Sequence, residues 1–143
     1  MERRPWHALA SAPNPYDELI DASEPRLVII TTPAYISDEL VEEVCSRITA
    51  LLELGERVSI CYDMTNMSMV TGTQRRRIMQ FQRDELHRFS KYFIAEAYVM
   101  RSFFARALIV AVESFARPSH PTRTFHDLEP AKAWLRHRIN EEK

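Results

Sequence analysis

Glycine and cysteine are both scarce in this sequence of 143 residues, with two of each. Two cysteines cannot build a disulfide framework, and their separation does not match the ligand spacing of a metal site. Cys45 and Cys61 each lie within an apolar pattern, so we expect both to be core thiols. The sequence predicts no bound metal and no cofactor.

Long hydrophobic runs and a large net charge are also missing. The most apolar segment, residues 107–112, is far shorter than the roughly 20 residues that a membrane-spanning helix needs. The N-terminus lacks the apolar core of a secretory signal. A net charge of -1 removes the basic field that nucleic-acid binding usually requires. We therefore expect a cytoplasmic protein with no membrane span and no nucleic-acid partner.

The length of the chain and its hydrophobic content of 45% support a single domain with a real core. Residues 1–15 contain three prolines and show no hydrophobic periodicity. We expect a flexible N-terminal arm there, and a domain over residues 16–143.

The first part of the domain predicts a hairpin and a helix. The strand-like segments at residues 18–23 and 26–32 are joined by a short turn, which favours antiparallel pairing. The helix begins after Ser37, whose hydroxyl suits an N-cap, and Gly55 suits its C-terminal cap. The apolar run at residues 57–64 then predicts a buried strand.

The rest of the domain alternates between helix and strand. We expect helices over residues 74–93, 102–116 and 127–139, and strands over residues 94–101 and 122–125. Ser102 and Asp127 are the expected N-caps. The order β-β-α-β-α-β-α-β-α predicts an α/β fold, with a mixed, mostly parallel sheet of about five strands and about four helices.

Helical spacing predicts which side chains of the last two helices are buried. For the helix after Ser102, the expected buried face is Phe104, Leu108, Ala111 and Phe115. For the final helix, the expected buried face is Ala131, Trp134, Leu135 and Ile139.

The order of elements, with the ending TFHDLEPAKAWL at residues 124–135, resembles the SpoIIAA-like branch of the STAS domains. This is the fold of bacterial anti-sigma-factor antagonists, and the resemblance covers roughly residues 16–139. It implies a domain that is not an enzyme and that binds protein partners or small ligands. Several members are controlled by phosphorylation in the loop after the third strand.

In that loop, typical antagonists carry Asp-Ser-Ser-Gly at the helix start, and the first serine accepts phosphate. Laid without gaps from Asp63, the four positions fall on Thr71, Gly72, Thr73 and Gln74. The acceptor position is therefore a glycine, which leaves Thr71 and Thr73 as candidate phosphorylation sites. A phosphate at a helix N-terminus is electrostatically favourable. The alternative is that one of these threonines only caps the helix.

We predict that another protein, such as a regulator or a kinase-like partner, binds this loop and the basic start of the next helix. The candidate residues are Thr65, Asn66, Ser68, Thr71, Gly72, Thr73, Arg75 and Arg76. A homodimer is a further candidate assembly. The alternative function is a small-ligand or lipid carrier, because part of this superfamily resembles Sec14-type lipid carriers.

An enzyme built around Asp63 is the third class of function. Metal chemistry there needs further acids, and the loop has no second carboxylate. The five histidines show no spacing that suggests a triad, so we predict no catalytic residues. A pairing of Asp63 with a loop N–H is the structural alternative.

Four methionines gather around the same loop: Met64, Met67, Met69 and Met79. Thioether side chains suit irregular cores, and they also suit adaptable binding surfaces. We expect core packing, and any methionine that is exposed would mark a partner-binding or lipid-binding patch.

Overall fold

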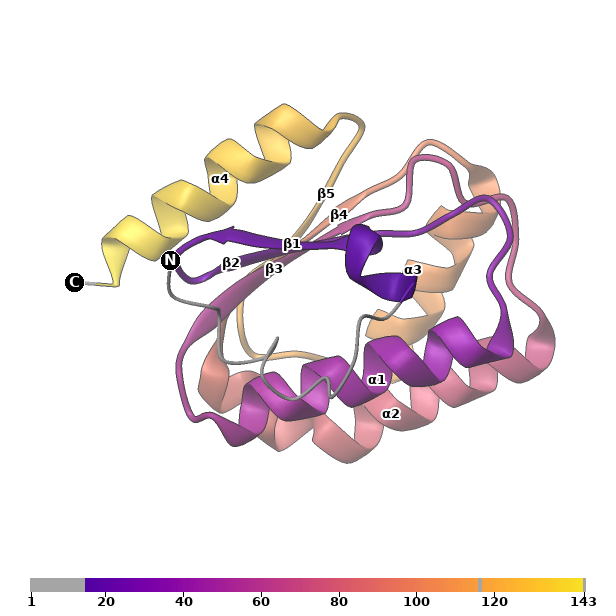
Figure 1. Ribbon diagram of the computed structural model, residues 1–143, viewed down its shortest axis with the longest axis horizontal. Coiled ribbons are helices and arrows are strands. Elements are labelled where there is room, and N and C mark those ends of the chain that lie inside the picture. The colour runs from indigo at the N-terminus through magenta and orange to yellow at the C-terminus, as the bar shows by residue number, and fades with distance from the viewer. Residues whose placement is uncertain (1–14, 116, 143) are drawn as a thin grey trace.

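A five-stranded mixed sheet forms the centre of the fold, in a computed structural model that describes residues 15–115 and 117–142. Its order is β1-β2-β3-β4-β5, with β1 antiparallel to β2 and all other neighbours parallel. The elements are η2 (Pro15–Leu19), β1 (Ile20–Glu24), β2 (Leu27–Thr31), α1 (Asp38–Glu53), β3 (Val58–Asp63), α2 (Gly72–Tyr92), β4 (Phe93–Val99), α3 (Phe103–Phe115), β5 (Thr122–Phe125) and α4 (Leu128–Glu141) (Figure 1). The predicted fold class and element order are confirmed.

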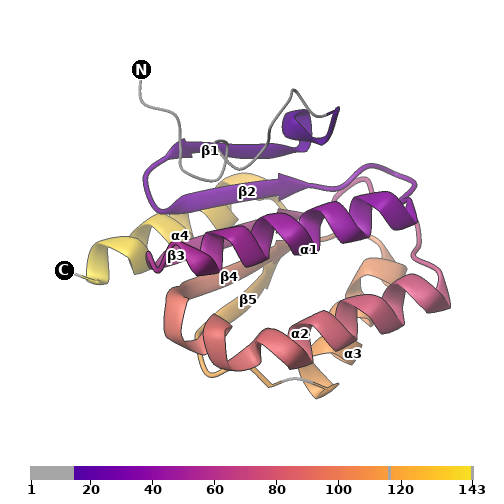
Figure 2. The same ribbon diagram turned by 60° about the horizontal axis from the view of Figure 1, so that its bottom comes forward.

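The strand order explains why three helices share one face of the sheet. From β2 to β5 the chain always moves one strand in the same direction, and right-handed crossovers then place α1, α2 and α3 on one side. Figure 1 shows α4 on the opposite side of the sheet from α1 and α2. Figure 2 shows α1 and α2 running side by side, in contact with each other.

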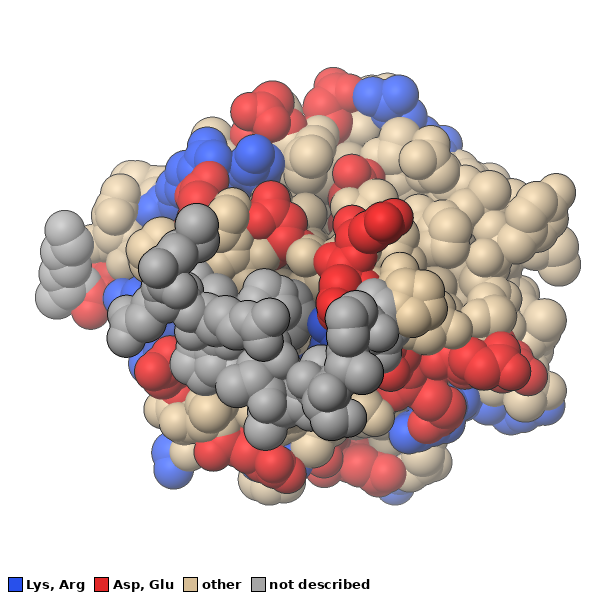
Figure 3. Space-filling model, viewed as in Figure 1, with Lys and Arg blue, Asp and Glu red and all other residues tan. Residues whose placement is uncertain are grey.

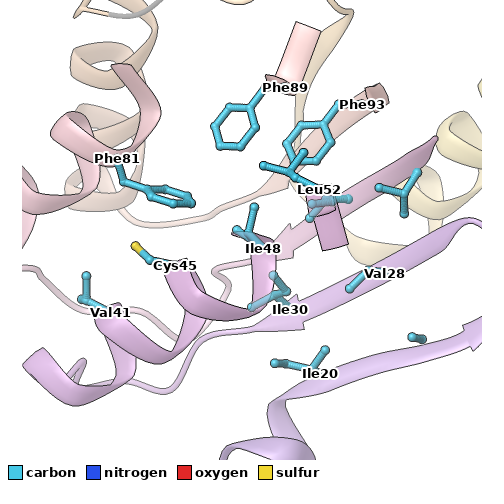
Figure 4. Close-up of a cluster of buried hydrophobic side chains, with 13 residues drawn as sticks. Ile20, Val28, Ile30, Val41, Cys45, Ile48, Leu52, Phe81, Phe89 and Phe93 are labelled. Atoms are coloured by element: carbon cyan, nitrogen blue, oxygen red, sulfur yellow. The ribbon is translucent and has the colours of Figure 1, made fainter. Parts of the chain in front are cut away.

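Alternate side chains of the strands feed separate cores on the two faces. The core under α1 and α2 includes Val28, Ile30, Cys45, Ile48, Phe81, Phe89 and Phe93 (Figure 4). The core under α4 includes Leu27, Ile29, Cys61, Ala97, Ala131 and Leu135, with Trp134 and Ile139 packed against it. The predicted buried face of the last helix is therefore confirmed.

Both cysteines are core thiols, as predicted. Cys45 and Cys61 are buried and free. Burial raises the pKa of Cys45 to about 11 and the pKa of Cys61 to about 12. Both side chains therefore stay protonated near neutral pH and pack as small hydrophobic groups.

The predicted caps of α1 are confirmed. The Ser37 hydroxyl accepts a hydrogen bond from the Leu40 N–H at 3.0 Å. Gly55 follows the last helical turn with a φ of 73°, a left-handed conformation that favours glycine. Its N–H donates to the Leu52 carbonyl at 3.1 Å. In α3, the Ser102 hydroxyl likewise accepts from the Ala105 N–H at 3.0 Å.

The predicted buried face of α3 was wrong in part. Leu108 is buried as predicted and Ala111 is half-buried, but Phe104 is exposed. The other buried side chains are Ala105, Ile109 and Val112. The helix is apolar on nearly every side, so apolar spacing cannot select one face. The small side chain of Ala105 faces the sheet instead, among Met64, Tyr98 and Met100. The side chain of Phe115 lies outside what the structure describes.

Two smaller predictions, on the start of the first strand and on the cap of the last helix, need correction, and a third concerns residues that the structure does not describe. Glu18 and Leu19 belong to the short helix η2, and β1 begins at Ile20. Asp127 occupies the N-cap position of α4 but makes no capping hydrogen bond, because its carboxylate pairs with Arg101 at 2.5 Å. The predicted arm lies outside the described residues, apart from Pro15.

Candidate functional site

The carboxyl ends of the parallel strands form one continuous edge. The Thr32 N–H donates to the Asp63 carbonyl at 2.9 Å, and the Met64 N–H donates to the Val99 carbonyl at 2.8 Å. The Met100 N–H donates in the same way to the Phe125 carbonyl at 3.0 Å. Loops that leave this edge therefore start from fixed positions, as is usual where α/β sheets bind ligands.

Asp63 shapes the start of the loop between β3 and α2. Its Oδ1 accepts a hydrogen bond from the Thr65 N–H at 3.1 Å and from the Thr65 hydroxyl at 2.5 Å. This is the structural pairing proposed as the alternative to chemistry at Asp63, and it engages the hydroxyl of the predicted site residue Thr65. Among residues 15–115 and 117–142, no group of three or more acids, histidines or cysteines could hold a metal ion.

The middle of this loop is tied to the loop between β2 and α1. The Ser68 N–H and hydroxyl both donate to the Ala34 carbonyl, at 3.1 Å and 2.7 Å. Tyr35 and Met69 then form a parallel β-bridge. Their backbones are paired, yet their side chains are 84% and 54% exposed. The two loops thus present two apolar side chains on a fixed backbone.

The methionines of the loop divide between core and surface. Met64 and Met67 are buried and Met79 packs against the same cluster, so core packing is confirmed for these three. Met69 is exposed, which is the arrangement that we associated with a binding patch.

Thr71 and Gln74 form a capping box at the start of α2. The Thr71 hydroxyl accepts from the Gln74 N–H at 3.0 Å, and the Gln74 side-chain oxygen accepts from the Thr71 N–H at 3.1 Å. The buried Gln74 amide also donates to the Ile36 carbonyl at 2.8 Å and to Asp38 at 2.9 Å. Thr71 is therefore the cap, as in the alternative given above, and Gln74 joins α2 to the start of α1. Thr-x-x-Gln is the sequence signal of the capping box, whereas the bonds from Gln74 to Ile36 and Asp38 have no local signal.

The arginines at the start of α2 differ in their partners. Arg77 donates two hydrogen bonds to Glu42 of α1, at 2.7 Å and 3.0 Å, and this lowers the pKa of Glu42. Arg75 and Arg76 are exposed and form no ion pair with the described part of the chain. The Arg76 guanidinium lies 3.4 Å from the Thr73 hydroxyl.

The structure brings most of the predicted site residues onto one surface, which we call the loop surface. It consists of Tyr35, Asn66, Ser68, Met69, Thr71, Gly72, Thr73, Arg75 and Arg76, all of which are exposed. Tyr35 was not predicted, because it lies in a different loop and joins the surface only through the β-bridge. Figure 3 shows mostly uncharged side chains over the upper part of the right-hand end of the molecule, where Figure 1 places these loops, with acidic and basic side chains below them.

A cavity of about 110 Å³ lies behind the loops, between the sheet and helices α1, α2 and α3. Its wall is almost entirely apolar and includes Ile36, Val44, Met67, Ile78 and Val112. Tyr62 and Tyr98 also line it, with rings stacked at a centroid distance of 5.2 Å. Burial, followed by the nearby Glu96 charge, raises the pKa of both tyrosine hydroxyls, which therefore stay neutral.

A buried acid and histidine pair joins β4 to the connection before β5. The Nε2 of His120 is 2.6 Å from the Oε1 of Glu96, and both side chains are almost fully buried. The Nδ1 of His120 has no hydrogen-bond partner among the described residues. A nucleophilic triad needs a hydroxyl or thiol at that nitrogen, so the pair has the geometry of a structural contact. No local pattern in the sequence pairs these two residues.

These features define a class of protein before any relative is considered. A mixed sheet with three helices on one face and one on the other, bearing exposed loops at its carboxyl edge, is the architecture of a STAS-like domain. The SpoIIAA-like family model matches residues 27–136, from β2 into α4. The chain therefore belongs to the SpoIIAA-like family. STAS-like domains of this kind are generally regulatory, without enzymatic activity, and interact with other proteins.

No curated protein matches the chain. Within the part of the chain that the structure describes, none of the helices combines the length and the apolar character needed to cross a membrane.

Proposed function

We propose that this chain is a cytoplasmic, non-catalytic regulatory domain that binds a protein partner through the loop surface. The observation that supports this most is the exposure of Tyr35 and Met69 on paired backbones. A preorganised backbone loses little conformational entropy on binding, so apolar anchors on it contribute more of their burial energy to affinity. Aromatic residues, methionine and arginine are also the residue types enriched in protein interfaces.

The test removes both anchors together. Tyr35→Ser with Met69→Asp replaces two exposed apolar side chains by polar ones, so the fold should be retained. Affinity capture from the native host, quantified by mass spectrometry, should show a partner that the wild-type chain retains and the double variant loses by about tenfold or more. Leu54→Ser is the matched control, because Leu54 is exposed at the opposite edge of the sheet. Equal recovery of the same proteins by all three chains would contradict the proposal.

Within this proposal, we favour one of the two candidate phosphorylation sites over the other. The Thr71 hydroxyl is engaged in the capping box, whereas Thr73 is exposed in the first turn of α2, close to Arg76. We therefore favour Thr73 as the modified residue, since a phosphate there would meet both the helix N-terminus and an arginine. Thr73→Glu and the pair Arg75→Glu with Arg76→Glu are added to the capture experiment, and each should reduce recovery of the same partner.

A second candidate function is the carriage of a small apolar ligand or lipid. The supporting observation is the apolar cavity of about 110 Å³ under α1, α2 and α3. Apolar cavities of about this size in other proteins stay dry and accept small apolar molecules. The buried Met64 and Met67 lie in its wall, where flexible side chains adapt to different shapes.

Native mass spectrometry of the purified protein tests the carrier function. If the cavity carries a ligand, the wild-type protein should show an added small-molecule mass. Val112→Phe fills part of the cavity and should abolish that mass, while thermal unfolding checks that the variant remains folded. A clean mass of the bare chain, together with no uptake of an added fatty acid, would leave partner binding as the only supported function.

A further inference from the structure

The outward face of α3 is apolar and uncovered. Phe103 is 79% exposed and Val110 is 60% exposed, and Ala107 lies exposed between them. Spacings of four and three residues place these side chains on one stripe along the helix. The opposite stripe, with Ala105, Leu108, Ile109 and Val112, packs on the sheet. A helix that is hydrophobic on all sides is normally buried on all sides.

Two opposite charges flank this outward stripe. Arg106 and Glu113 are seven residues apart, which is nearly two full turns, so they lie on the same side of the stripe. Neither forms an ion pair with another residue in the described part of the chain. Other surface arginines do form ion pairs, as Arg77, Arg101 and Arg136 show.

This arrangement of charges is complementary to itself. In a two-fold symmetric pair the same patch is used by both copies, and two equivalent helices can cross in antiparallel directions. With the axis near Val110, Arg106 of one copy lies beside Glu113 of the other, and the reciprocal contact forms at the far end. The two-fold axis also places the charged flank of one helix next to the charged flank of the other, so Arg106 and Glu113 of the two copies can meet. Ala107, next to Val110 on the stripe, is small enough to allow close approach of the helices.

We propose that the outward face of α3 is a self-association surface, on which two copies of this chain pair antiparallel about Val110. The apolar stripe supplies the buried area, and the two reciprocal Arg106 to Glu113 contacts select the antiparallel register. The surface is separate from the loop surface, so neither proposal depends on the other.

The test is a charge swap, measured by sedimentation equilibrium of the full chain over a concentration series up to the solubility limit. Arg106→Glu and Glu113→Arg each replace two attractive contacts by two repulsive ones. Each should weaken the dimer by about tenfold or more. The combined variant Arg106→Glu with Glu113→Arg restores both pairs with exchanged signs, and should return to within about threefold of the wild-type dissociation constant.

Two controls separate this surface from others. Arg123→Glu reverses an exposed charge on β5 and should leave the dimer unchanged. Tyr35→Ser with Met69→Asp should also leave it unchanged, so failure of this inference is distinguishable from failure of the proposed function. A wild-type chain that stays monomeric at every concentration overturns the proposal. So does a dimer that survives both single reversals, or a double swap that fails to restore association.

Discussion

Replacing His120 with alanine should lower the free energy of unfolding by about 3–5 kcal/mol, because it leaves Glu96 buried without its partner. The two side chains meet at 2.6 Å and are almost inaccessible to solvent. The Oε2 of Glu96 has no hydrogen-bond partner among the described residues, so the contact with His120 at Oε1 is the hydrogen bond that the carboxylate loses. Urea denaturation followed by circular dichroism measures the loss as a lower midpoint.

A double variant supplies the control for this prediction. Glu96→Leu combined with His120→Phe removes both polar groups and keeps most of the volume. It should recover much of the stability that His120→Ala loses, because apolar replacement of a whole buried pair is often neutral. If His120→Ala alone costs less than about 1 kcal/mol, then Glu96 is reached by water and the pair does not hold this part of the sheet together.

Replacing Phe89 with alanine should cost a similar amount, about 3–5 kcal/mol, for an apolar reason. The ring of Phe89 is fully buried and stacks on Phe93 at a centroid distance of 4.6 Å. It also meets the edge of Phe81 at 5.7 Å. The truncation therefore opens a cavity between α2 and β4 that neighbouring side chains fill only in part. Thermal or urea unfolding measures the loss.

Phe104→Ala is the matched control for the Phe89 variant. It removes the same atoms from an exposed position on α3, so the change in unfolding free energy should stay within about 0.5 kcal/mol. Equal losses for the two variants would contradict the assignment of Phe89 to the core.

Local signals in the sequence were sufficient to predict most of the fold. The Ser37 cap, the Gly55 terminator and the apolar stripe between them define α1 without reference to the rest of the chain, because each depends on neighbours within a few residues. The buried strand before Asp63 and the final helix were recognisable for the same reason. Element order then led to the correct fold class.

Hydrophobic spacing did not predict the buried face of a helix that is apolar on nearly every side. The segment that forms α3 could be assigned as a helix, but its buried face is set by contacts with β4 and with the loop after β3. These contacts involve Tyr98 in the strand just before α3, and also Met64 and Met67, which are remote from α3 along the chain. Periodicity alone therefore favoured Phe104, which the structure places outside.

The candidate site was predicted in part. Thr71, Thr73, Arg75 and Arg76 became candidates because the loop has a recognisable pattern, and all four are exposed. Tyr35 and the bonds from Gln74 to Ile36 and Asp38 were missed, since they join segments more than 30 residues apart. Glu96 and His120 were also missed, because they are 24 residues apart and meet only in the folded chain. A glutamate inside an apolar strand signals that a partner exists, but not which residue it is.

The strand order also bears on how the chain assembles during synthesis. Every strand pairs with the strand made just before it, so the sheet can grow from its N-terminal hairpin as translation proceeds, with short loop closures at each step. The face of the sheet that packs against α1, α2 and α3 is covered as each of these helices is made. The opposite face stays exposed until α4 is made and packs on β3 and β4. A nascent chain paused before residue 128 therefore displays Leu27, Ile29, Cys61 and Ala97 to the solvent, which makes that interval the one in which a chaperone has most to protect.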